Sequence, residues 1–273
     1  MPTYLRIGRA PALALAAGAL LMSSQAGLSQ ANGDDDVDEE ELPFDEAQLY
    51  FELNHTDGDL GIHGLIDGDA WKSLEIEGPE GPNEQLLMNV WIRGALRRQG
   101  MTEIFFESDE PGFDELSPAR FFARFPAGIY EFEGITLEDE VLEAELRLSH
   151  VMPGPPGGVK VNGMNSARNC DATLPVVNEP VTLDWNPVTR SHPGIGTPNV
   201  GVTVLSYEVV GEIEREGKTP EVLVFSALLP RSVTEFVFPE SFTGLVEDEM
   251  KFEIVTKLTN GNQTAVESCF EIE

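Results

Sequence analysis

The stretch Val141-Leu-Glu-Ala-Glu-Leu-Arg-Leu-Ser149 decides the fold class of this chain. Its apolar residues stand at every second position, at Leu142, Ala144, Leu146 and Leu148, and charged or polar residues separate them. A period of two is typical of an antiparallel strand with one face on the core and the other in water. The stretch therefore predicts a mainly β protein.

The same alternation extends over residues 47–151. We expect strands at 48–54, 60–66, 71–77, 85–92, 102–107, 128–134 and 141–149. The dipeptide Asp67-Gly68 predicts a tight hairpin turn between the second and third of these strands. One helix is expected, with Ser117 as its N-cap and Pro118 as its first residue. Residues 47–151 thus predict an N-terminal all-β domain with one short helix.

Residues 170–273 alternate in the same way, over a length that suits a sandwich of the immunoglobulin class. The strand 181–185 directs Trp185 inward, and Asn260-Gly261 predicts a hairpin turn before a final strand at 263–272. Residues 152–169 are rich in Pro, Gly and Asn and predict an inter-domain linker. The expected fold is therefore mainly β, with two antiparallel β-sandwich-like domains.

Short motifs in the C-terminal segment resemble those of fibronectin type III domains. The stretch VTLDWNPVT, which contains Trp185, resembles the second strand of that family, and Tyr207 resembles the Tyr of the third strand. Leu245, followed by MKFEIV at 250–255, resembles the sixth strand, although Met250 stands where the family has its corner Tyr. The resemblance implies a fibronectin type III, immunoglobulin-like fold for residues 170–273. It also implies a spacer or binding module, by fold-level analogy.

The N-terminus has the pattern of a secretory signal peptide. Arg6 and Arg9 precede a short apolar run, and small-x-small cleavage sites end at Ala26 and at Ala31. We assign residues 1–31 to the signal peptide and expect an exported protein, periplasmic or extracellular. The apolar run is shorter than the ~18 residues of a membrane span, so we expect no span in the mature chain.

The chain is strongly acidic. It has 48 Asp and Glu against 17 Lys and Arg, a net charge of −31, and losing Arg6 and Arg9 takes this to −33. Residues 32–46, NGDDDVDEEELPFDE, predict an acidic disordered tail. Such a charge repels nucleic-acid phosphates and anionic lipid headgroups. We therefore expect a protein or a polysaccharide as partner and no nucleic acid.

The two cysteines, Cys170 and Cys269, both lie in the C-terminal segment. In an oxidising compartment such a pair is expected to form a disulfide. In a regular fibronectin sandwich, the start of the first strand and the end of the last strand lie toward opposite ends. The bridge therefore requires a swapped or kinked first strand, for which Pro175 provides the position.

Two Asp-Gly-Asp stretches, Asp57–Asp59 and Asp67–Asp69, are the most suggestive polar motif. Facing each other across a hairpin they would offer calcium its oxygen ligands, whereas the alternative is that Asp-Gly simply makes tight turns. His55 and His63 are residue types that zinc uses, and scattered surface histidines are the alternative there. The sequence contains no nucleophile elbow, Walker A loop or dinucleotide fingerprint. It therefore assigns no catalytic, cofactor-binding or metal-binding residue.

Two functions follow from these patterns. The first is an exported, non-enzymatic binding or accessory protein of the bacterial envelope or exterior, whose N-terminal domain recognises an unidentified partner. Its candidate residues are Trp71, Trp91 and the Asp-Gly-Asp turns, with core packing as the other role of the two tryptophans. The alternative is a small carbohydrate-active enzyme, or a calcium-dependent carbohydrate-binding module, with a fibronectin type III accessory domain. The enzyme requires a cleft with paired acids and exposed aromatic rings within residues 47–151.

Overall fold

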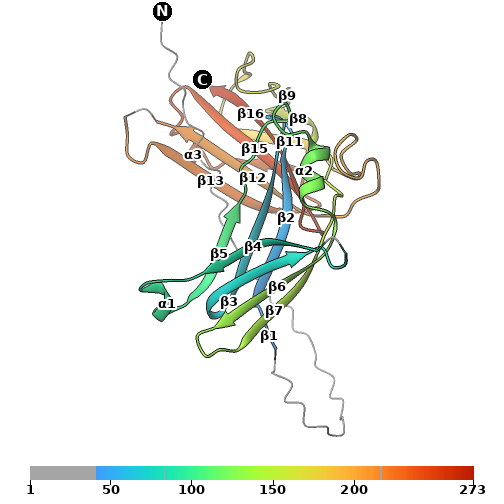
Figure 1. The fold of residues 1–273 in the computed structure, drawn as a ribbon. Coiled ribbons are helices and arrows are strands. Elements are labelled where there is room, and N and C mark those ends of the chain that lie inside the picture. The colour runs from blue at the N-terminus through green and yellow to red at the C-terminus, as the bar shows by residue number, and fades with distance from the viewer. Residues whose placement is uncertain (1–40, 83, 216) are drawn as a thin grey trace, which may run out of the picture. The chain divides into compact units, whose positions relative to one another are not determined.

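The computed structural model describes residues 41–273 apart from residues 83 and 216, so the predicted signal peptide and residues 32–40 of the predicted tail lie outside it. Strands make up most of the described chain and confirm the mainly β fold class (Figure 1). The strands before residue 152 are β1 (Leu42–Pro43), β2 (Glu46–Asn54), β3 (Asp59–Gly78), β4 (Gln85–Trp91), β5 (Met101–Glu107), β6 (Gly128–Thr136) and β7 (Val141–Leu148). The later strands are β8 (Gly157–Val161), β9 (Met164–Asn165), β10 (Val176–Val177), β11 (Thr182–Asn186), β12 (Val204–Glu214), β13 (Val222–Pro230), β14 (Glu235–Val237), β15 (Glu249–Leu258) and β16 (Gln263–Ile272). The helices are α1 (Leu96–Gln99), α2 (Pro118–Arg124) and α3 (Glu240–Thr243).

The long strand β3 organises the N-terminal half. Its first part pairs with β2 and β5 and its last part with β4 and β6, and β7 and β1 continue the sheet beyond β6. The predicted hairpin at Asp67-Gly68 is wrong, because β3 runs through it with a register shift between Asp67 and Trp71. Gly68 instead permits close packing, since a Cβ there would lie 3.1 Å from Cδ1 of Phe44. The glycine serves a close approach and not a turn.

The predicted helix packs on β2 and closes one side of the N-terminal core. Helix α2 begins at Pro118 as expected, with Ser117 at the N-cap position but without a capping bond from its side chain. The ring of Phe51 meets those of Phe121 and Phe122 edge-on, at 5.7 and 5.2 Å between ring centroids. All three phenylalanines are buried, so the Phe-rich face of the helix is core packing. The one-turn helices α1 and α3 were not expected.

Residues 41–46 close the other end of this core. They belong to the segment that the sequence predicts to be a disordered tail. In the structure Leu42 and Pro43 pair with β7 in parallel, and Phe44 is buried in the core. Two apolar residues and a proline at the end of an acidic run are enough to bury this short piece.

The C-terminal half consists of two sheets with a hydrophobic core that includes Trp185 and Tyr207. One sheet has the order β14-β11-β8-β9, and the other runs β16-β15-β12-β13 as part of the large sheet. The rings of Trp185 and Tyr207 meet edge-on at 5.4 Å, and Oη of Tyr207 accepts a hydrogen bond from the backbone N of Val188. Strands β8 and β9 lie within residues 152–169, the predicted linker, where Val161 is buried. The domain boundaries stay predictions.

Strand β16 joins the two halves. Its Gln263, Thr264 and Ala265 pair in parallel with Glu52, Leu53 and Asn54 of β2, so one sheet continues through both halves. The described residues accordingly belong to one compact unit.

Side chains at the start of β16 reinforce this junction. Oγ1 of Thr264 donates to the carbonyl of Pro153, and Nδ2 of Asn262 donates to the carbonyls of Ser149 and Val151. The chain that leaves the N-terminal half is thus tied to the last strand.

The sulfurs of Cys170 and Cys269 are bonded, with 4.9 Å between their Cα atoms. The strand that follows Cys170, β10, lies where the bridge requires it. Strand β10 pairs in parallel with β16, and the backbone N of Glu271 donates to the carbonyl of Pro175. This pairing brings the start of the segment beside the end of the last strand.

Candidate functional site

The two Asp-Gly-Asp stretches do not face each other. Asp57 lies in the turn between β2 and β3, Asp59 begins β3, and Asp67 and Asp69 lie farther along that strand. Because a strand rises ~3.3 Å per residue, Asp59 and Asp67 are about 26 Å apart. The hypothesis that the two stretches face each other across a hairpin to form one calcium site is therefore wrong, and the alternative that Asp-Gly makes a tight turn applies to neither Asp67 nor Gly68.

His55 and His63 have different partners in the structure, and His55 lies beside His192. Nε2 of His192 lies 3.2 Å from Nδ1 of His55, and the backbone N of Gly194 donates to Nδ1 of His192 at 3.1 Å. A neutral His192 therefore donates its Nε2 proton to His55. Partial burial lowers the pKa of both rings, and for His192 the nearby His55 lowers the pKa further. His63 lies on β3 with other partners.

The two candidate tryptophans have opposite environments. Trp71 is fully buried, and its Nε1 donates to the carbonyl of Thr102 at 3.3 Å. Trp91, at the end of β4, is 66% exposed. Of these two residues, therefore, Trp91 offers its ring to a partner and Trp71 packs the core.

Trp91 adjoins a basic loop on the edge of the sheet. Strands β4 and β5 follow the same edge of β3, with Trp91 opposite Ser73 and Met101 opposite Trp71. The nine residues 92–100 leave this edge and return to it, and we call them the edge loop. It contains α1 and three exposed arginines, Arg93, Arg97 and Arg98.

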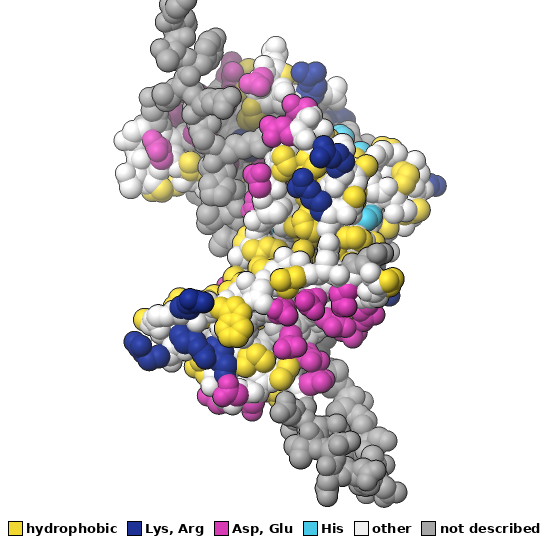
Figure 2. Space-filling view, viewed as in Figure 1, with side chains coloured by type: hydrophobic (Ala, Val, Ile, Leu, Met, Phe, Trp, Pro, Cys, Tyr) yellow, Lys and Arg dark blue, Asp and Glu magenta, His cyan; other side chains and the backbone are white. Residues whose placement is uncertain are grey.

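The edge loop is a local exception in an acidic chain. Figure 2 shows basic side chains gathered beside hydrophobic ones in the region where Figure 1 places α1. In the described part of the chain, none of the three arginines takes part in an ion pair. Within this part of the chain, all three arginines are exposed.

Six glutamates form a ladder on the outer face of β3, β6 and β7. One row is Glu75, Glu133 and Glu143, and the other is Glu77, Glu131 and Glu145, each directly opposite its neighbours. Figure 2 shows the acidic side chains gathered over β6 and β7. Like charges directly opposite each other destabilise a sheet. Partial loss of water raises the pKa of Glu131, as do nearby Glu80 and Glu84, and the pKa of Glu143 is raised similarly, with Glu41 as neighbour.

This ladder makes stability depend on pH in a defined direction. The pKa of Glu131 and of Glu143 is higher in the folded protein than in the unfolded chain, so the folded protein binds more protons and loses stability as pH rises through those values. We expect the double variant Glu131→Gln/Glu143→Gln to raise the free energy of unfolding at pH 8 by about 0.5 kcal/mol, because exposed charges are screened. Urea denaturation at pH 8 and pH 4 measures this, and the gain should vanish at pH 4. A gain that persists at pH 4, or that the exposed Glu221→Gln reproduces, contradicts it.

A second polar cluster lies where β2, β3 and β5 pair. Nε2 of His63 lies 3.1 Å from Oε1 of Glu110, and one ligand atom from each of His63, Glu107 and Glu110 lies within 4.8 Å of the others. The rings of Tyr50 and His63 lie 5.3 Å apart. The His63 side chain is 5% exposed, whereas Glu107 is exposed, so the cluster opens to solvent on one side.

Burial and neighbouring charges shift the pKa values of His63 and Glu52 in this cluster. Burial would lower the pKa of His63, but the hydrogen bond with Glu110 and the charge of Glu52 raise it above its ordinary value. Burial also raises the pKa of Glu52 to about 7, with His63 acting in the opposite direction and Glu110 adding to the rise. The cluster therefore holds the ring of His63 next to several carboxyl groups that lack full hydration.

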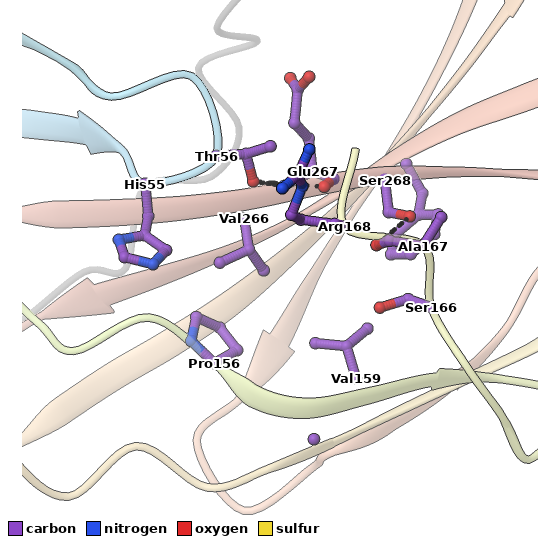
Figure 3. Close-up of a pocket in the computed structure, with 12 residues that line it drawn as sticks. His55, Thr56, Pro156, Val159, Ser166, Ala167, Arg168, Val266, Glu267 and Ser268 are labelled. Atoms are coloured by element: carbon purple, nitrogen blue, oxygen red, sulfur yellow. Dashed lines mark hydrogen bonds between the residues drawn. The ribbon is translucent and has the colours of Figure 1, made fainter. Parts of the chain in front are cut away.

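A small pocket lies between the middle of β16 and residues 156–168 (Figure 3). Ser268 donates from Oγ to the carbonyl of Ala167, and the backbone N of Glu267 donates to Oγ1 of Thr56. The carboxylate of Glu267 is held by Nζ of Lys251 at 2.9 Å. These polar groups tie the walls of the pocket together, which is a structural role.

Sequence reasoning missed the edge loop and the His63 cluster for different reasons. The run Arg93-Gly-Ala-Leu-Arg97-Arg98 is visible as a basic segment in an acidic chain, and that signal could have pointed to the loop. Glu107 and Glu110 lie more than 40 residues after His63 and carry no motif spacing. Only the pairing of β3 with β5 brings them to the histidine.

Comparison with known proteins leaves the family open. No family model and no curated protein matches the chain. A tetra-tandem repeat from the extending region of a large adhesion protein is 12% identical, with a TM-score of 0.27 over 84% of this chain and 50% of that one, so the chain spans half of that structure. A 1.5-MDa bacterial ice-binding adhesin is 12% identical (TM-score 0.23; 85% and 66% covered), and red sea bream transglutaminase is 10% identical (TM-score 0.21; 83% and 31% covered). Similarities of this size carry no argument about function.

No helix among the described residues is long and apolar enough to cross a membrane.

Proposed function

We propose that this protein is an exported, non-enzymatic binding protein whose edge loop binds an anionic polysaccharide. The observation that carries the proposal is the exposed Trp91 beside Arg93, Arg97 and Arg98. A guanidinium binds carboxylate or sulfate groups through two parallel hydrogen bonds. A tryptophan ring adds a large apolar face that can lie against a sugar ring. The tryptophan and the three arginines all lie within residues 91–98.

The glutamate ladder restricts where such a ligand can lie. It occupies the outer face of the same sheet, where Asn89 of β4 lies opposite Glu75. Trp91, two residues after Asn89, lies on the same face about 7 Å farther along β4. Because charges act over ~8 Å at physiological ionic strength, the ladder repels a polyanion from the Glu75 side of Trp91, and the arginines of the edge loop attract it on the other side. The ligand is thereby directed to the loop and Trp91.

Export and the C-terminal module are part of the same proposal. The signal-peptide pattern supports export to the periplasm or exterior, and the disulfide suits an oxidising compartment. The pairing of β11 with β14 and the order β16-β15-β12-β13 support a fibronectin type III-like fold. Buried Trp185 and Tyr207 support it as well, while Leu245, matched to the sixth-strand leucine, is exposed. We assign this module a spacer role.

Binding to polygalacturonate and dextran sulfate, with neutral dextran as the uncharged comparison, tests the proposal. We expect the triple variant Arg93→Gln/Arg97→Gln/Arg98→Gln to lose at least about a hundredfold in affinity, because each charge-assisted hydrogen bond contributes about 1.5–3 kcal/mol. Trp91→Ala should lose about tenfold, and added salt should weaken binding of the unchanged protein.

The matched control is Arg120→Gln/Arg124→Gln/Arg147→Gln, which removes the same charge from exposed positions elsewhere in the N-terminal half. It should bind like the unchanged protein. Equal loss in both triple variants, or equal binding of neutral dextran, overturns the proposal.

A further inference from the structure

The cluster around His63 is built by strand register. His63 of β3 lies directly opposite Tyr50 of β2 and Glu107 of β5. Paired residues in adjacent strands point to the same face of a sheet, so these three side chains share one face. Glu110 reaches the same place from the loop after β5, since it bonds Nε2 of His63. Residues from two strands and a loop therefore converge on one point.

The potential ligand atoms of these residues lie slightly farther apart than they would around a bound metal ion. One atom from each of His63, Glu107 and Glu110 lies within 4.8 Å of the other two. Three ligands at ~2.0–2.2 Å from one ion in tetrahedral geometry lie about 3.3–3.6 Å apart, so closure requires only small rotations of the two glutamates.

The orientation of His63 and the space beside Gly61 favour a ligand here. Nε2 of His63 faces Oε1 of Glu110 at 3.1 Å, whereas its Nδ1 is buried without a hydrogen-bond partner in the described structure, so Nε2 is the ring atom that would bind an ion. Gly61, next on the same face of β3, leaves room for the carboxylate of Glu110, with which a Cβ would collide. The fold thus provides space for a carboxylate beside a buried imidazole.

We propose that His63, Glu107 and Glu110 bind one divalent transition-metal ion, with Zn²⁺ as the representative ion. One imidazole and two carboxylates are a ligand set that suits zinc and its neighbours. Calcium prefers six to eight oxygen ligands, which this cluster lacks. The exposed side at Glu107 leaves the fourth position to water. This proposal is independent of the polysaccharide proposal, because the site lies on β3 and β5 and not on the edge loop.

Calorimetric titration of the purified protein with Zn²⁺, and with Mg²⁺ for comparison, tests the assignment. We expect one Zn²⁺ per chain and a loss of at least about tenfold in affinity for Glu107→Gln and for Glu110→Gln, because losing even an outer-shell partner of a metal ligand costs about 10–100-fold. Gly61→Ala should weaken binding to a similar extent, because it displaces Glu110 without changing any ligand. Co²⁺ absorption spectra should lose their visible bands in the same variants.

Two controls separate this site from other acids and histidines. Glu131→Gln/Glu145→Gln alters the exposed cluster of Glu80, Glu131 and Glu145, and His192→Gln alters the His55–His192 pair. Both controls should bind Zn²⁺ like the unchanged protein. The assignment is overturned if Zn²⁺ affinity falls in either control and not in Glu107→Gln, or if the unchanged protein binds Zn²⁺ no more tightly than the Glu107→Gln/Glu110→Gln variant does.

Discussion

Replacing Asn262 by Ala is expected to lower the free energy of unfolding by about 2–5 kcal/mol, since each buried polar group left without a partner costs about 1–3 kcal/mol. Asn262 is fully buried at the turn before β16. Its Oδ1 accepts from the backbone N of Phe51 at 2.9 Å, and its Nδ2 donates to the carbonyls of Ser149 at 2.6 Å and Val151 at 3.0 Å. One side chain thus connects β2, the chain after β7 and the β15–β16 turn.

The variant Asn260→Ala is the matched control. Asn260 lies two residues earlier in the same turn and is half-buried; its Nδ2 donates to the carbonyl of Val151 at 3.0 Å, and its Oδ1 accepts from the backbone N of Asn262 at 3.2 Å. Its replacement should cost about 1–2 kcal/mol, the contribution of two ordinary hydrogen bonds at a half-buried position. Guanidinium denaturation followed by tryptophan fluorescence measures both variants. Equal losses in the two would show that Asn262 acts only through the turn and does not tie the halves together.

Removing the disulfide with Cys170→Ala/Cys269→Ala is expected to lower the free energy of unfolding by about 4–5 kcal/mol in the chain-entropy model. The bridge spans a sequence separation of 99 residues, so its loss frees a long loop in the unfolded chain. The folded protein keeps the pairing of β10 with β16, which retains the local geometry. Equilibrium unfolding in guanidinium measures the change.

Reduction of the unchanged protein provides the control for lost side-chain volume, because it opens the bridge and keeps both sulfurs. Reductant should destabilise the unchanged protein by a similar amount and leave the double variant unaffected. An unchanged protein that is equally stable with and without reductant would refute this prediction.

Local patterns predicted most strands of this protein correctly. The alternation in 141–149 and the dipeptide Asn260-Gly261 correspond to β7 and to the turn before β16. Pro118 begins α2 as its fixed φ favours. Asp67-Gly68 failed because the sequence does not distinguish a glycine needed for a turn from one needed for close packing, here against Phe44.

The sequence predicted the candidate sites less well than it predicted the strands. Trp71 is followed by Lys72 and Ser73 in the chain, whereas Trp91 lies between Val90 and Ile92, yet Trp71 is core and Trp91 is on an exposed edge. The difference arises because β4 has a neighbour on one side only, whereas Trp71 lies in the middle of the sheet. Exposure of an apolar residue is decided by the neighbours of its strand.

The sequence by itself determined which segments are strands, which face of each strand is apolar, and the charge and cysteine content of the chain. These properties depend on residues close together in the chain. The tertiary structure decided which strands are neighbours: β2 beside β16, and β3 beside β5. Every strand offers the same backbone donors and acceptors along its edges, so alternation specifies a face and not a partner. The contacts of His63 with Glu110 and of Asn262 with Phe51 follow from that choice of partner.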